Sequence, residues 1–122
     1  MSTITVTNIK ATGETASRAV SGVAAAWANV NGVGTVSIRD SANAASIVDA
    51  GTGRYEVSLL NDLASINASV VAEGNTGIGQ FNRACSVMFD NTNDVELTCF
   101  NTDTNATIDL NYVMYQVNGD LA

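Results

Sequence analysis

Two cysteines are the most reactive side chains in this 122-residue sequence. A hairpin with its turn centred on Thr92 sets Cys85 opposite Cys99 and pairs apolar residues on either side, such as Val87 with Leu97. Both thiols then face a buried side, where they form a redox pair or disulfide, or serve as small hydrophobic residues. The sequence favours the second interpretation, because no base or helix N-terminus nearby would lower a thiol pKa.

Oxygen-rich loops offer a second chemistry, the binding of a cation. Asn101, Asp103 and Asn105 alternate like the first ligands of a calcium loop. Ala106, however, occupies the position where such a loop needs glycine, and Tyr112 stands where it needs a bidentate glutamate. Turn formation explains these residues, and no metal site is expected.

The composition argues against catalysis. The chain has no histidine, which removes Ser-His-Asp and Cys-His arrangements and any imidazole base near neutral pH. A glycosidase would need two carboxylates facing a cleft. The sequence does not bring a pair of its aspartates together, and a chain of this length is short for building such a cleft. We therefore expect no enzyme, no catalytic residues and no cofactor.

Charge and hydropathy limit the partners. The net charge is −7, and the five Lys and Arg residues are scattered singly, so no basic stripe is available for a nucleic acid. The longest uninterrupted apolar run, Val23–Ala28, is far shorter than a membrane span. Neither nucleic-acid binding nor membrane insertion is expected.

Periodicity divides the chain into a leader, residues 1–25, and a strand-rich domain, residues 26–122. In the leader, Thr3–Ile9 alternates like a short strand, and Thr15–Trp27 is compatible with either a short helix or a linker of small residues. Glycine and Asn/Asp clusters separate eight further strands, expected at Ala26–Val30, Thr35–Arg39, Ala45–Val48, Arg54–Leu60, Ile66–Ala72, Phe81–Phe89, Asp94–Phe100 and Thr107–Val117. Short strands at this spacing predict an all-β fold, an antiparallel β-sandwich or jelly-roll-like domain.

The last expected strand is apolar on both faces, which predicts self-association. Leu110, Tyr112 and Met114 lie on one face, and Val113, Tyr115 and Val117 on the other. The chain also lacks proline and has one lysine, residues that commonly protect exposed strand edges. We expect a homo-oligomer whose subunit interface includes Tyr112, Met114, Tyr115 and Val117.

The segment Ala26–Asn43 resembles a family found in bacteriophage genomes, mostly of marine and cyanobacterial phages. That family carries the pattern A-W-V-N-F-N-G-x-G-T-V-x-I-R-x-S-x-N, and the present sequence reads AWANVNGVGTVSIRDSAN. Ser46–Leu59 continues the similarity, and Asn111–Asp120 is similar to the family's closing Y-V-x-V-Q-V-x-G-D. The middle of the chain, Asn61–Asn105, departs from the pattern.

The resemblance implies a virion protein with a trimeric β-sandwich, assembled in the host cytoplasm. It also implies that the leader, through Thr3, Ile4, Val6 and Ile9, attaches the protein to the major capsid protein or another virion protein. Because the sequence contains no coiled-coil or collagen-like shaft, a capsid decoration (cement or head-fibre) protein is expected. The alternative is a tail-fibre head that binds a host surface glycan through loops such as Glu73–Gly79.

Overall fold

The computed structural model describes residues 2–10, 12–13, 15–16, 18–19, 23–79 and 81–122. These residues form ten strands and no helix. The strands are β1 (Asn8–Ile9), β2 (Arg18–Ala19), β3 (Ala24–Asn31), β4 (Ser37–Ala42), β5 (Ala44–Gly51), β6 (Arg54–Leu59), β7 (Ser69–Asn75), β8 (Arg83–Phe89), β9 (Asp94–Asn101) and β10 (Tyr112–Asn118).

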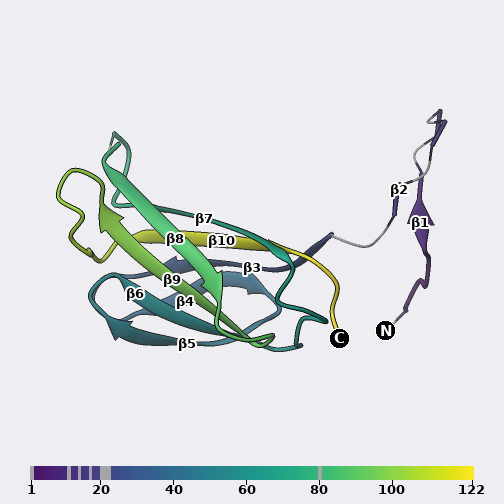
Figure 1. Cartoon of the computed structure of the whole chain (residues 1–122), viewed down its shortest axis with the longest axis horizontal. Helices are drawn as coiled ribbons and strands as arrows, with labels where there is room; N and C mark the ends of the chain where they lie inside the picture. Colours follow the sequence, from purple (N-terminus) through teal and green to yellow (C-terminus); the bar gives the residue numbers. More distant parts are fainter. Residues whose placement is uncertain (1, 11, 14, 17, 20–22, 80) are drawn as a thin grey trace.

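Two antiparallel four-stranded sheets pack face to face, which confirms the predicted β-sandwich (Figure 1). The first sheet has the strand order β4-β3-β10-β7 and the second β5-β6-β9-β8. The last strand of the chain, β10, therefore lies inside the first sheet, between β3 and β7.

Alternation along the strands builds the core between the sheets. On β10, Val113, Tyr115 and Val117 point inward and are buried, whereas Tyr112 and Met114 point outward. The inward neighbour of Tyr115 on β3 is Ala28, and the small side chain leaves space for the ring. The second sheet supplies the opposing core residues, among them Tyr55, Val57, Val95 and Leu97.

A single residue, Asn43, joins the two sheets between β4 and β5. Its φ of 59° lies in the left-handed region, which turns the chain from one layer into the other. The side-chain amide donates to the carbonyl oxygens of Ala25 (3.1 Å) and Asn61 (3.0 Å), and its Oδ1 accepts from the Asn61 N–H (2.7 Å). Asn43 therefore stabilises the turn between the two sheets and holds the backbone at Asn61, just after β6, beside this turn.

The leader is less regular than predicted. Within Thr3–Ile9 only Asn8–Ile9 are strand residues, and this short β1 pairs with β2. The helix considered for residues 15–27 is not formed in the described part of that segment, because residues 24–27 belong to β3; residues 17 and 20–22 lie outside the described residues. In Figure 1 the leader stands apart from the sandwich.

The last strand begins later than predicted, at Tyr112 instead of Thr107. Leu110 lies before it and is fully buried, so it does not share the outward face of Tyr112 and Met114. Tyr115 and Val117 are 3% and 0% exposed, because the second sheet covers them. A subunit contact through these two side chains is therefore corrected: of the four residues expected at the interface, Tyr112 and Met114 are the ones on the exposed face.

Candidate functional site

The hairpin register expected from the sequence is confirmed, but the favoured state of the cysteines is wrong. Cys85 and Cys99 are direct cross-strand partners on β8 and β9, and they form a disulfide with Cα atoms 4.1 Å apart. The opposite sheet makes room for it at Gly74, where an added Cβ would collide with the Cys85 sulfur and come within 2.5 Å of Leu110 Cδ1. The disulfide is thus a packed structural link between an edge strand and its neighbour.

The oxygen-rich loop after β9 uses its side chains to make turns. The Asn101 Oδ1 accepts from the Asp103 N–H at 2.8 Å, and the Asp103 Oδ2 accepts from the Asn82 side chain at 2.8 Å. Asn105 has a φ of 57° and donates its N–H to the Asn101 carbonyl oxygen. The described residues contain no group of three or more Asp, Glu, Cys or His side chains placed to hold a metal ion.

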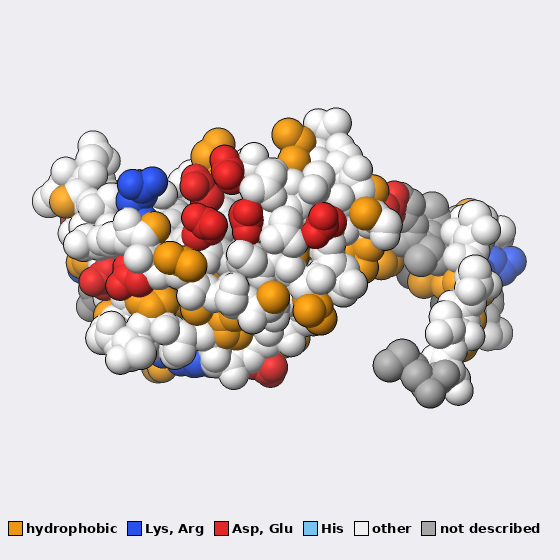
Figure 2. Space-filling model, turned by 90° about the horizontal axis from the view of Figure 1, so that it is seen from below, with side chains coloured by type: hydrophobic (Ala, Val, Ile, Leu, Met, Phe, Trp, Pro, Cys, Tyr) orange, Lys and Arg blue, Asp and Glu red, His pale blue; other side chains and the backbone are white. Residues whose placement is uncertain are grey.

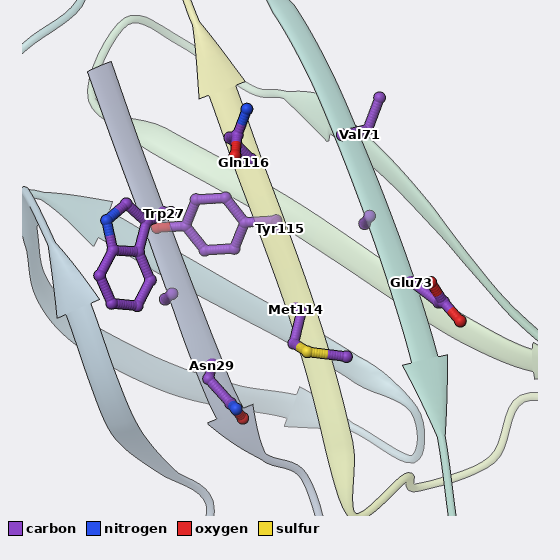
Figure 3. Close-up of a pocket in the computed structure, with 9 residues that line it drawn as sticks. Trp27, Asn29, Val71, Glu73, Met114, Tyr115 and Gln116 are labelled. Atoms are coloured by element: carbon purple, nitrogen blue, oxygen red, sulfur yellow. The ribbon is translucent and has the colours of Figure 1, made fainter. Parts of the chain in front are cut away.

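A groove on the outward face of the first sheet is the candidate binding site, and we call it the outer groove. Its volume is about 480 Å³, and β3, β10 and β7 form its floor (Figure 3). The outward side chains that line it are Trp27, Asn29, Val71, Glu73, Met114 and Gln116. It combines an exposed apolar surface with groups that can donate or accept hydrogen bonds, as ligand sites generally do.

Strand register explains why these side chains meet. Trp27 and Gln116 are cross-strand partners, as are Met114 and Glu73, so they project from the same face. Trp27 stays 37% exposed because its other neighbour, on the edge strand β4, is the small Ala42.

A second hollow of about 480 Å³ adjoins the outer groove and shares Glu73 and Met114 with it. Tyr112, Gly77 and Ile78 line its far end, and Ile78 is fully exposed. The segment Glu73–Gly79, expected as a loop, is in fact strand up to Asn75 and loop beyond it.

Arg39, on the edge strand β4, lies over the ring of Tyr112, which lines the second hollow. A register shift between β3 and β4 accompanies its placement, and the guanidinium lies 4.6 Å from the centre of the Tyr112 ring. It also donates to the Val30 carbonyl oxygen (2.9 Å) and to the Asn31 Oδ1 (3.0 Å). Sequence reasoning missed this contact, because the bulge that carries it leaves no mark in the alternation.

Two tyrosines lie buried beneath the groove and the adjacent turn. Burial raises the pKa of Tyr55 to about 12, with a smaller contribution from the Asp109 carboxylate, and burial raises the pKa of Tyr115 to about 12 as well. The Tyr55 hydroxyl donates to the Gly32 carbonyl oxygen at 3.0 Å. The Tyr115 hydroxyl has no hydrogen-bond partner among the described residues.

The outward face of the second sheet has a different character. Glu56 and Glu96 are direct cross-strand partners, and Asp94 follows on the same face of β9, where it accepts from the Ser58 hydroxyl at 2.8 Å. Figure 2 shows acidic side chains gathered along one side of the sandwich. Like charges placed side by side repel, so this face is suited to solvent, not to a second acidic chain.

The predicted attachment residues are all on the surface of the leader. Ile4 is 85% exposed, Val6 47% and Ile9 50%, and Thr3 is exposed beside them. All four residues belong to the leader, whereas the residues of the outer groove belong to β3, β7 and β10. Large apolar side chains gathered this way mark interaction surfaces.

Comparisons of the chain with protein-family models, with curated proteins and with solved structures found no match. Among the described residues, no helix is long and apolar enough to cross a bilayer.

Proposed function

We propose that this chain is a non-catalytic structural protein of a bacteriophage virion, a capsid decoration protein that assembles as a trimer on the particle. The observation that carries the proposal is a pair of uncovered apolar surfaces: the leader with Ile4, Val6 and Ile9, and the outer groove with Trp27 and Met114. Each surface fits a protein partner. The similarity of Ala26–Asn43 to phage virion proteins supplies the kind of particle.

In this proposal the two surfaces have separate roles on the particle. The leader docks its apolar side chains on the major capsid protein or another virion protein. On the particle, where the leaders are bound, identical copies associate through the outward face of β10, at Tyr112 and Met114. The acidic face of the second sheet points to solvent and keeps the decorated particle soluble.

The test is the number of copies in purified particles, together with a truncation. Hundreds of chains per particle support capsid decoration, whereas a few to tens support a tail location. Deleting residues 2–12 should abolish attachment while circular dichroism and thermal unfolding show an intact sandwich. A truncated protein that still decorates particles contradicts the role given to the leader.

A second candidate is a tail-fibre head that binds a host glycan in the outer groove. The observation in its favour is Trp27, which is partly exposed beside its cross-strand partner Gln116, with Glu73 farther along the same groove. Sugar rings stack on aromatic faces while polar groups nearby bind their hydroxyls. A glycan array probed with the pure protein tests it. Binding that is lost in Trp27→Ala would favour this function over decoration.

A further inference from the structure

We propose that residues 2–10 of one copy bind in the outer groove of a neighbouring copy when the protein is off the particle. The inference deepens the proposed function and rests on its association of identical copies. The leader then has two successive partners, first a neighbouring copy and later the particle surface.

The leader has the side chains for such a contact and lacks cover in its own chain. Ile4 and Val6 alternate with Thr3 and Thr5, so an extended backbone places the two apolar side chains on one side. Both are exposed, and the only strand that β1 pairs with among the described residues is β2. Ile4 and Val6 thus offer apolar surface that a neighbouring copy would remove from water.

The outer groove offers a matching surface. Its floor is a β-sheet face with Trp27, Val71 and Met114 exposed by 37%, 61% and 37%, so it presents apolar area along a shallow, elongated path. The adjoining hollow extends that path toward Tyr112 and Ile78. An extended segment with apolar side chains on one side can lie along such a surface without folding further.

Charge favours the leader over other parts of the chain as the occupant. Lys10 is the only charged residue between positions 2 and 13 and the only lysine of the protein. Glu73 and Asp40 lie at the two ends of one row across the first sheet, about 14 Å apart at normal strand spacing. Arg39, the cation near them, already donates to Val30 and Asn31. The groove therefore attracts a segment of positive charge, while the acidic faces of two copies repel.

A leader bound in a neighbour's groove fits the closed trimer of the proposed function. A leader bound in a neighbour's groove is a heterologous contact, because it joins two different surfaces of the same chain. Repeated around a rotation axis, it forms a ring in which every leader and every groove is filled. A trimer is such a ring. The same contact hides the apolar side chains of the leader until the particle competes for them.

The only tryptophan of the chain reports whether the groove is filled. The full-length protein is studied by light scattering and by Trp27 fluorescence across a dilution series. We expect an oligomer with short-wavelength emission that dissociates to a 12.6 kDa chain as emission moves to longer wavelength. The double variant Ile4→Asn with Val6→Asn, which removes the two apolar side chains and adds no charge, should be monomeric at every concentration, with the long-wavelength emission.

A matched control carries the same two amide side chains on the other side of the segment. Thr3→Asn with Thr5→Asn should keep the oligomer and the short-wavelength emission. If this control dissociates as completely as the apolar variant, a general disturbance of the segment and not lost apolar contact is responsible, and the inference is overturned.

Cross-linking identifies the occupant, because Lys10 is the only side-chain amine. A carbodiimide should join Lys10 of one chain to Glu73 or Asp40 of another, with mixed isotope labels in the linked peptides. Links confined to one chain would show that the leader folds back on its own groove. An oligomer that persists in the apolar variant would show that whole sheet faces pack together, and a monomeric wild type with long-wavelength emission would show an empty groove. Each of these three results overturns the inference.

The two proposals fail separately. Lack of leader exchange in the free protein refutes the inference and leaves particle decoration standing. Leader exchange in solution combined with absence of the protein from purified particles refutes the proposed function alone.

Discussion

Removing the same hydroxyl group at two buried tyrosines should change stability in opposite directions. Tyr55 and Tyr115 are both almost fully buried, at 1% and 3% exposure. They differ in what the hydroxyl contacts: that of Tyr55 donates to the Gly32 carbonyl oxygen, and that of Tyr115 has no partner among the described residues. The substitutions Tyr55→Phe and Tyr115→Phe therefore separate the value of a hydrogen bond from the cost of burying a hydroxyl.

The magnitudes follow from the free energy of satisfied and unsatisfied buried groups. Tyr55→Phe leaves the Gly32 carbonyl without this donor, which should lower the free energy of unfolding by about 1–3 kcal/mol. Tyr115→Phe removes a buried hydroxyl that has no hydrogen-bond partner among the described residues, which should raise the free energy of unfolding by up to about 1–2 kcal/mol. For a chain of this size each kcal/mol moves the melting temperature by about 3–5 °C.

Urea unfolding followed by circular dichroism measures both variants against the wild type, and the disulfide is kept oxidised throughout. An unchanged slope with urea shows that the midpoint shift reports stability. The reasoning is refuted if Tyr115→Phe is destabilised by more than about 1 kcal/mol, since its hydroxyl would then have a bound partner such as a buried water molecule. A neutral Tyr55→Phe would refute the value given to the bond with Gly32.

Three further perturbations test the corner, the disulfide and the buried tyrosines. Asn43→Ala should lower the free energy of unfolding by about 2–4 kcal/mol, and Asn43→Gly by clearly less, because glycine adopts the left-handed φ without strain and loses only the side-chain hydrogen bonds. Equal losses for the two variants in urea unfolding would contradict this explanation. Reducing the disulfide should lower the free energy of unfolding by about 3 kcal/mol for its 14-residue separation, measured as a lower urea midpoint with reductant. Gly74→Ala should lower the free energy of unfolding by about 2–3 kcal/mol, because the added methyl group crowds the sulfur atoms. An unchanged midpoint in either case would count against the packing described. The pKa of each buried tyrosine is raised from 10 to about 12, so between these values the folded state keeps a proton that the unfolded state loses. The free energy of unfolding is therefore unaffected below pH 10 and should fall by about 2–3 kcal/mol per tyrosine toward pH 12. In Tyr115→Phe this fall should be smaller than in the wild type, and an equal fall would show that ionisation of Tyr115 is not linked to unfolding.

The sequence was sufficient for local features of the fold. Alternation and turn residues placed eight strands close to where they lie, and the hairpin register that pairs Cys85 with Cys99 is confirmed. These features depend on neighbours along the chain, so a single sequence carries them. The strand order within each sheet depends on contacts between distant segments, and no pattern in the sequence reports it.

The candidate site was harder to predict for the same reason. Tyr115 and Val117 were expected at a subunit interface, but the second sheet covers them, and single-strand periodicity cannot tell which face the rest of the chain will bury. The disulfide was not favoured by the sequence, because no residue near either thiol would activate it and because the space for the bond comes from Gly74 on the opposite sheet. The outer groove joins β3, β7 and β10 and appears only once these strands are neighbours.

The central position of β10 sets an order on assembly during synthesis. The strands of the second sheet, between Ala44 and Asn101, are all made before Tyr112 leaves the ribosome, so that sheet can form its hydrogen bonds first. β10 lies between β3 and β7 and is hydrogen-bonded to both, so until β10 is made these two strands are not joined in one sheet. The outer groove therefore comes into existence with the last strand, and a nascent chain has no place to receive a leader until its body is almost complete.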